Sequence, residues 1–288
     1  MDPLTLLLLW SGALLVVGTY TDLRWREVPD WLNFAAIAAG AGTRIIASVA
    51  TGDWSYSLIG AMGFGAALAI AYAMFYLGQW GGGDSKMLLA LGMLLGIEPS
   101  SLDTIGIAFF INCLLVGAAY GIAWSAALAL THWSAFAKHV RIMFAHGALR
   151  QIVGGVMVMA LMLAVLSFVV PEQLRLSLVL LAVSVPALTI IGVMIKAVEL
   201  GCMLRRIAPE RLTEGDWIVK DIVVGGKRIV GPRDLGVSVP QIKQLVEFAR
   251  KGRIKTVLIK EGIPFVPSFL LAFIVTLAAG NLMLLLLP

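Results

Sequence analysis

The stretch that decides the fold lies near the start of the chain, where residues 4–20 read LTLLLLWSGALLVVGTY and contain no charged side chain. An apolar run of this kind is typical of an α-helix that crosses the ~30 Å hydrocarbon core of a membrane. The run has no basic start, and it continues into Thr21 and Asp22 in place of a small-residue cleavage site, which argues against a signal peptide. It therefore predicts a first membrane-spanning helix.

Similar apolar runs recur along most of the 288 residues. The other seven cover residues 31–50, 56–78, 85–97, 103–130, 152–170, 174–197 and 264–287. The run at 85–97 is short and would rise only about 20 Å as a helix. Because 60% of the chain is hydrophobic and only 14% is charged, against about 25% in a soluble domain, a soluble enzyme is excluded. We expect a polytopic α-helical membrane protein with about eight transmembrane helices and a small α+β cytoplasmic domain.

The α+β domain is predicted at 199–262, where charged residues return. Residues 217–224, a Gly-Gly pair and residues 227–230 have the pattern of a β-hairpin. Ser238 and Gln241 have the spacing of a capping box that opens an amphipathic helix. Residues 256–259 predict another strand.

These features divide the chain into five predicted parts. They are an N-terminal membrane domain (1–130), a basic interfacial segment (131–151), an additional pair of transmembrane helices (152–198), the α+β domain (199–262) and a last transmembrane helix (263–288).

The basic residues predict the orientation in the membrane. Four segments, 22–30, 79–86, 131–151 and 196–262, contain 20 of the 22 Lys and Arg. With eight spans these segments lie on one side, which the positive-inside rule makes cytoplasmic, so both termini are expected outside. The net charge of +5 therefore indicates topology and contact with membrane lipids, and no nucleic-acid partner is expected.

The cysteines and histidines do not suggest a metal site. Cys113 and Cys202 are far apart in the chain, which supports neither a disulfide framework nor a structural zinc site. His132, His139 and His146 recur every seven residues, too far apart along a helix to bind one metal ion.

Two aspartates carry the strongest indication of chemistry. Asp22 closes the first predicted helix, and Asp84 opens the fourth within the sequence GGGDSK of residues 81–86, so both are expected at the cytoplasmic membrane edge. Two adjacent carboxylates can share one proton, so that one deprotonates water while its protonated partner polarises a peptide carbonyl. We predict Asp22 and Asp84 as the catalytic pair of an aspartyl protease. The alternatives are that Asp84 only caps a helix and that Asp22 only pairs with nearby arginines.

Four further residues are candidates for supporting roles. Gly81 and Gly83 lack side chains, so a substrate strand has room to approach the backbone beside Asp84. Lys86 either tunes Asp84 electrostatically or extends to the membrane interface. Asn112 either hydrogen-bonds near the site or joins two helices elsewhere.

Four segments resemble one peptidase family. Residues 22–30 (DLRWREVPD) and 81–86 (GGGDSK) look like the paired signatures of the Gly-x-Gly-Asp aspartyl peptidases that mature type IV prepilins. Residues 214–217 (EGDW) and 261–269 (EGIPFVPSF) resemble the archaeal branch, the preflagellin (prearchaellin) and archaeal prepilin peptidases.

The resemblance implies an endopeptidase that cleaves class III signal peptides of prepilin or prearchaellin precursors at the cytoplasmic face of the plasma membrane, with Asp22 and Asp84 as its carboxylates. It implies no metal and no organic cofactor. It also implies a six-helix core, to which the pair at 152–198 is an addition. The leaders of such precursors are typically basic, so Glu27 and Asp30 either attract them or form a solvated loop.

The methyltransferase activity of bacterial relatives is not expected, because their insert with paired Cys-x-x-Cys motifs is absent from this sequence. The sequence does not choose between pilin and archaellin precursors as substrates, and it does not indicate an oligomeric state.

Other functions compete with this interpretation. A presenilin-like intramembrane protease shares the Gly-x-Gly-Asp pattern, and residues 186–188 (PAL) resemble a further motif of such proteases, but they lie within the additional helix pair. A transporter would use charged groups inside the membrane, yet we expect no charged residue at the middle of any span. A membrane anchor for a basic cytoplasmic domain is the third alternative.

Overall fold

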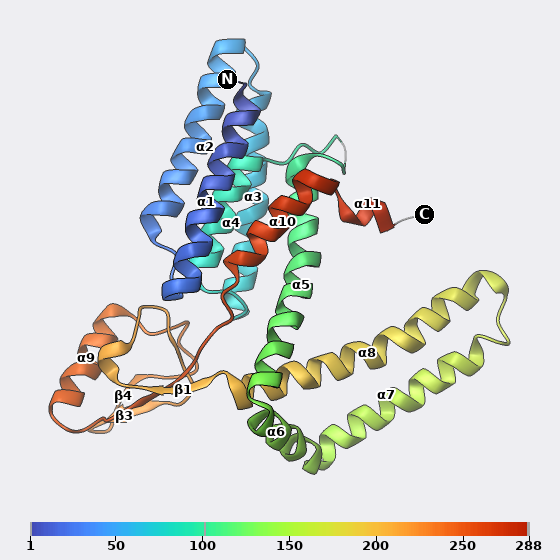
Figure 1. Cartoon of the computed structure of the whole chain (residues 1–288), viewed down its shortest axis with the longest axis vertical. Coiled ribbons are helices and arrows are strands. Elements are labelled where there is room, and N and C mark those ends of the chain that lie inside the picture. The colour runs from blue at the N-terminus through green and yellow to red at the C-terminus, as the bar shows by residue number, and fades with distance from the viewer. Residues whose placement is uncertain (1, 101, 287–288) are drawn as a thin grey trace.

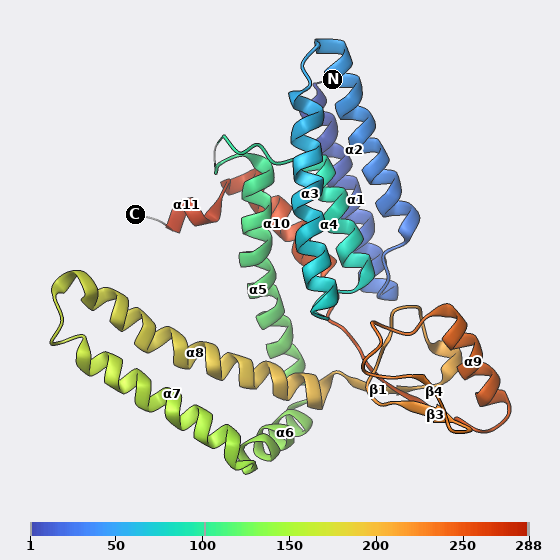
Figure 2. The same cartoon turned by 180° about the vertical axis from the view of Figure 1, so that it is seen from behind.

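The computed structural model describes residues 2–100 and 102–286, and most of them are helical (Figure 1, and Figure 2 from behind). The α-helices are α1 (Pro3–Trp25), α2 (Asp30–Thr51), α3 (Ser55–Tyr76), α4 (Gly82–Leu95), α5 (Ile105–Thr131), α6 (Trp133–Ala145), α7 (Gly147–Leu166), α8 (Glu172–Cys202), α9 (Val239–Arg250), α10 (Val266–Ala279) and α11 (Leu282–Leu286). Within the described residues, six helices are long and apolar enough to cross a membrane: α1, α2, α3, α5, α7 and α8. The prediction of a polytopic helical membrane protein is confirmed.

The two remaining apolar runs form shorter helices. Helices α4 and α10 have 14 residues each, which corresponds to a length of about 21 Å. Helix α4 begins at Gly82, three residues before the predicted start, and thereby includes Asp84. The total of eight membrane crossings stays a prediction.

Helix α4 lies in a bundle with α1, α2, α3 and α10 (Figure 1). Its side chains Met87, Leu88, Leu91 and Leu94 are at most 1% exposed. The backbones of α3 and α4 are in direct contact at Gly63 and Gly92: a Cβ at Gly63 would collide with the carbonyl of Gly92. Small residues allow such close packing between membrane helices, and here they hold α4 in a fixed position.

Helix α2 contributes a buried charge to this bundle. Arg44 is 4% exposed, and its guanidinium donates to the carbonyls of Met93 (2.8 Å), Leu94 (2.8 Å) and Tyr56 (2.9 Å). The carbonyls of Met93 and Leu94 lie in the last turn of α4, where no helical N–H follows to bond them. Arg44 therefore closes the C-terminal end of α4. Arg44 lies in the C-terminal third of α2, away from the middle of the helix to which the expectation of uncharged spans applied, and these backbone acceptors accommodate its charge.

The last predicted run, 264–287, is not one continuous helix. Helix α10 ends at Ala279, and Gly280 follows with a φ of 67°, a conformation that only glycine adopts freely. Asn112 of α5 binds this end of α10: its side-chain amide donates to the Thr276 hydroxyl (3.0 Å) and to the Gly280 carbonyl (2.7 Å), and its carbonyl oxygen accepts from the Leu282 amide (3.0 Å). These bonds agree with the alternative in which Asn112 joins helices.

Helix α5 packs along α10 at the edge of the bundle, and α6 to α8 lie outside it. Helix α6 packs against the ends of α5 and α8 through Phe136, Ala129, Ala197 and Val198, and α7 and α8 form an antiparallel hairpin that projects away from the bundle (Figure 1 and Figure 2). Most of their apolar side chains are exposed. This hairpin contains the predicted additional pair at 152–198.

The segment after α8 contains all five described strands. Strands β1 (Leu204–Ile207), β5 (Val257–Lys260) and β2 (Trp217–Ile218) form an antiparallel sheet with β5 in the centre. Strands β3 (Ile222–Val224) and β4 (Lys227–Val230) form the predicted hairpin. Its turn uses Gly225 and Gly226, which have φ values of 60° and 78° and so meet the requirement of a tight turn for positive φ. The prediction of one strand over 217–224 is wrong, because β2 pairs with β5 and not with the hairpin.

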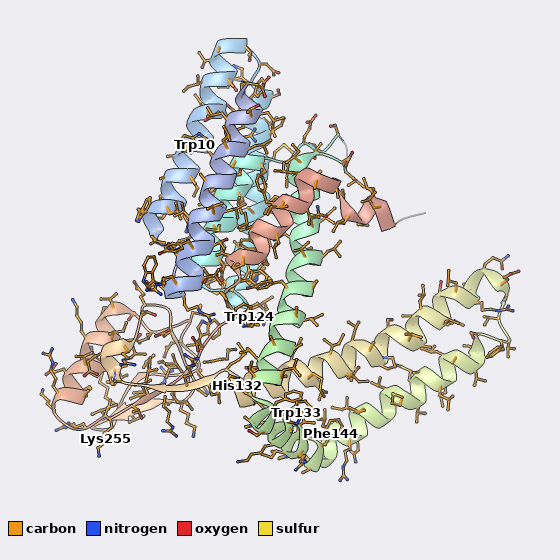
Figure 3. The ribbon with its side chains drawn as sticks, in the orientation of Figure 1. Trp10, Trp124, His132, Trp133, Phe144 and Lys255 are labelled. Carbon is orange, nitrogen blue, oxygen red and sulfur yellow. The ribbon has the colours of Figure 1, made fainter. Side chains whose placement is uncertain are left out.

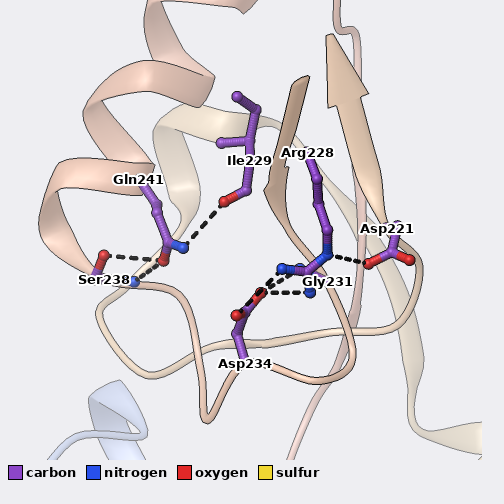
Figure 4. Close-up of polar contacts among 7 residues, drawn as sticks. All are labelled: Asp221, Arg228, Ile229, Gly231, Asp234, Ser238 and Gln241. Carbon is purple, nitrogen blue, oxygen red and sulfur yellow. Dashed lines mark hydrogen bonds and ion pairs between the residues drawn. The ribbon is translucent and has the colours of Figure 1, made fainter. Parts of the chain in front are cut away.

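Helix α9 covers these strands and begins with the predicted capping box. The Ser238 amide donates to the Gln241 side chain (2.8 Å), which in turn donates to the Ile229 carbonyl (3.1 Å), as Figure 4 shows. Nearby, the Arg228 guanidinium binds both Asp221 (2.7 Å) and Asp234 (2.8 Å). The hairpin, the following loop and α9 are thus tied together by polar contacts.

The α+β domain, here residues 204–260, lies beside one end of the bundle (Figure 1). Its Trp217 packs on the turn between α3 and α4, since a Cβ at Gly78 would lie 2.8 Å from the indole ring. Its strand β5 leads within six residues to the start of α10. The domain therefore contacts the part of the chain that precedes Asp84 and the part that precedes α10.

Candidate active site

Asp22 lies one turn before the end of α1 and is 7% exposed. Its carboxylate accepts a hydrogen bond from the backbone amide of Val266, the first residue of α10, at 3.0 Å. Helix α1 ends because Arg26 adopts a left-handed conformation (φ 60°) and donates its amide to the Asp22 carbonyl. The Arg26 guanidinium then donates to the carbonyl of Gly262 (3.1 Å). Asp22 and Arg26 both contact the segment that joins the α+β domain to α10.

Asp84 occupies the third position of α4 and is partly buried. The residue before the helix is Gly81, whose amide donates to the Asp84 carboxylate at 3.3 Å. This bond agrees with the alternative in which Asp84 caps the helix, although Gly81 is the N-cap residue and Asp84 caps it from the third position of the helix. An acidic residue is favourable there because the positive end of the helix dipole faces it.

The packing of α1 on α4 brings the two aspartates to the same place. Gly18 lies one turn before Asp22, and Met87 lies about one turn after Asp84 on the facing helix. A Cβ at Gly18 would collide with Met87, and it would lie 3.4 Å from the side chain of Val266. An electrostatic interaction links the two carboxyl groups. Two residues 62 positions apart are thus brought to the same end of the bundle.

The other predicted supporting residues differ in their contacts. Gly83 packs against Val28, which would lie 3.3 Å from a Cβ at position 83. The missing side chain of Gly83 therefore makes room for Val28 of the same chain, and not for a substrate strand. The Lys86 ammonium forms an ion pair with Asp30 at 2.6 Å. Of the two acids considered for attracting a basic leader, Asp30 is thus paired with Lys86. The other, Glu27, is exposed in the loop between α1 and α2.

Aromatic side chains next to the carboxylates were not predicted from the sequence. Trp80 directly precedes Gly81, and its ring lies 5.6 Å from those of Phe265 and Phe269 at the start of α10. Trp124 of α5 points toward the bundle (Figure 3) and lies under the Arg26 guanidinium, 5.8 Å from its ring centroid. The segment 261–269 was singled out by resemblance, but its role in contacting Asp22 depends on packing that no local pattern reveals.

The described residues offer no set of metal ligands. In the ranges 2–100 and 102–286, no three His, Cys, Asp or Glu side chains gather in a possible metal site. What these residues bring together is a buried carboxyl group, Asp22, and a partly buried one, Asp84, with a backbone N–H donor on each.

Part of this chain is similar to known peptidases. Residues 2–122 match the type IV leader peptidase family. A preflagellin peptidase of Methanococcus maripaludis (strain C6) is 36% identical over 84 residues, which are 29% of this chain and 36% of that protein. The chain thus spans about a third of the length of this curated relative. No solved structure matches. The predicted resemblance to prepilin and preflagellin peptidases is confirmed.

Proposed function

We propose that this chain is a membrane aspartyl endopeptidase that cleaves the class III signal peptides of prepilin or prearchaellin precursors at the cytoplasmic membrane face, with Asp22 and Asp84 as its catalytic residues. The observation that carries the proposal is the close packing of α1 on α4 between Gly18 and Met87, which brings the helix ends that bear these two carboxyl groups together. Both lie in the part of the chain that matches leader peptidases.

The roles of the two carboxyl groups follow from their hydrogen bonds. Asp22 receives the shorter bond, 3.0 Å from Val266 against 3.3 Å at Asp84, and it also has the Arg26 charge nearby. Donors and positive charge stabilise a carboxylate, so we assign Asp22 as the ionised member and Asp84 as the one that holds the shared proton. Asp22 then takes a proton from water, and Asp84 donates to the peptide carbonyl under attack.

The position of the pair supports cleavage at the membrane edge. Asp22 lies in the last turn of α1 and Asp84 in the first turn of α4. A presenilin-like protease would hold its aspartates deeper in the spans. The signal-peptide junction of a precursor, where a polar leader meets an apolar segment, has the same change of polarity as this end of the bundle.

The experiment compares the purified protein with Asp22→Asn and Asp84→Asn in detergent or lipid nanodiscs. The substrate is a prearchaellin or prepilin precursor, and mass spectrometry locates the cut. Each variant is expected to lose activity by about 10²–10⁴-fold, the range for removal of an acid–base group. The matched control is Asp53→Asn, because Asp53 is an exposed acid in the α2–α3 loop. Cleavage that survives in either catalytic-site variant, or no cleavage by the unmodified protein, would contradict the proposal.

A further inference from the structure

A third polar side chain, that of Tyr120 on α5, lies at the level of the carboxyl pair. One turn before it, Gly117 packs on the start of α10, since a Cβ there would lie 3.0 Å from Phe265. One turn after it, Trp124 contacts the Arg26 guanidinium, and the Tyr120 and Trp124 rings are 5.7 Å apart. Because Phe265 precedes the residue that binds Asp22, these two contacts place Tyr120 beside the Asp22 end of the site.

The Tyr120 hydroxyl is buried and has no hydrogen-bond partner among the described residues of the chain. The charges of Asp22 and Arg26 both act on it. A buried hydroxyl is almost always hydrogen-bonded, because an unpaired one costs about 1–3 kcal/mol. If the side chain only filled space, phenylalanine would fill it equally well. The hydroxyl therefore indicates a hydrogen-bond partner from outside the described residues of the chain.

We propose that Tyr120 is a third catalytic residue, whose phenolic O–H donates to the carbonyl oxygen of the scissile peptide as that oxygen becomes an oxyanion. The inference rests on the proposed function and adds a donor to it. Water adds to the carbonyl carbon while its proton passes to Asp22, and the oxyanion accepts hydrogen bonds from Asp84 and Tyr120. When the C–N bond breaks, the leaving nitrogen takes up a proton from the pair. Tyr120 keeps its own proton throughout.

The test measures kcat and KM for precursor cleavage by the full chain and by Tyr120→Phe. The substitution removes one oxygen and keeps the ring that packs on Trp124. Loss of one hydrogen bond to a charged oxygen corresponds to about a 10- to 100-fold lower kcat, and KM is expected to change less than about threefold because the bond forms mainly in the transition state. The matched control is Tyr20→Phe: Tyr20 is two positions from Asp22 but 61% exposed, and this variant is expected to cleave normally.

A second readout separates catalysis from packing. A peptide with a secondary alcohol in place of the scissile carbonyl mimics the tetrahedral state, and it is expected to bind Tyr120→Phe at least about 10-fold more weakly than the unmodified protein. Unchanged kcat and unchanged inhibitor affinity in Tyr120→Phe would overturn this inference and leave the proposed function intact. Failure of the unmodified protein to cleave any precursor would refute the proposed function, and the inference with it.

Discussion

Replacement of Arg44 by methionine tests how the short helix α4 is held in place. The change removes the donor from the carbonyls of Met93 and Leu94, which Arg44 bonds at 2.8 Å. It also removes one donor from the Tyr56 carbonyl (2.9 Å), which lies in the first turn of α3 and keeps its helical N–H partner. Each buried carbonyl left without a donor costs about 1–3 kcal/mol, or about 2–6 kcal/mol for the two. Part of this loss is offset because the variant no longer has to desolvate a buried charge. We therefore expect a net loss of about 1–4 kcal/mol in the free energy of unfolding.

The assay is thermal unfolding in a fixed detergent or in nanodiscs, followed by intrinsic tryptophan fluorescence. For a protein of this size, about 2–4 °C of Tm is lost per kcal/mol, so Arg44→Met is expected to unfold about 2–16 °C below the unmodified protein. Arg44→Lys should also be destabilised, because an ammonium group lacks the planar fork that reaches several acceptors.

The control for this series is Arg141→Met, which removes an exposed arginine from α6 and should shift Tm by less than about 2 °C. A Tm of Arg44→Met that matches the unmodified protein would refute the view that Arg44 closes α4. In that case the carbonyls of the last turn of α4 must find other donors.

Three further outcomes are expected. Gly63→Val should lower Tm at least as much as Arg44→Met, because the new side chain collides with the Gly92 carbonyl and forces α3 away from α4. Lys86→Met should change the free energy of unfolding by less than about 1 kcal/mol, since its ion pair with Asp30 is exposed; a large loss of precursor cleavage without loss of Tm would instead assign Lys86 to the reaction. The pKa of Asp234 is lowered, because hydrogen bonds from Arg228 and from a backbone amide outweigh the effect of burial. The ionised Asp234 therefore stabilises the fold above pH 3.8, the ordinary pKa of an aspartate, and this stabilisation is lost as the pH falls below that value. Between pH 6 and pH 3 the Tm of Asp234→Asn should accordingly fall less steeply than the Tm of the unmodified protein.

The features that could be predicted from the sequence depend on residues close together in the chain. The apolar run at 4–20 predicts α1 because the length of such a run reflects the thickness of a membrane. Ser238 and Gln241 predict the start of α9 because both ends of a capping box lie within one turn. Asp22 and Asp84 could be predicted as a pair because each falls at the end of an apolar helix on the same predicted face.

The features that could not be predicted depend on contacts between distant segments. The donor to Asp22 is a backbone amide 244 positions away, and every residue type except proline carries such a group. The acceptors of Arg44 are likewise backbone carbonyls, so no residue type marks them in the sequence. Tyr120 lies in an unbroken apolar run, where only the packing of α5 on α10 distinguishes it from a residue that faces lipid.

The segment between β5 and α10 limits where insertions and deletions can occur in this protein. Strand β5 ends at Lys260, and only six residues later the Val266 amide binds Asp22, outside the 2–122 region that matches leader peptidases. A chain cut back to that region would keep both aspartates and lose the donor on one of them. An insertion in the link would shift the donor away from the carboxylate, whereas an insertion at the exposed Gly225–Gly226 turn would leave it in place. The length of this link is thus under tighter constraint than the loops of the domain that it follows.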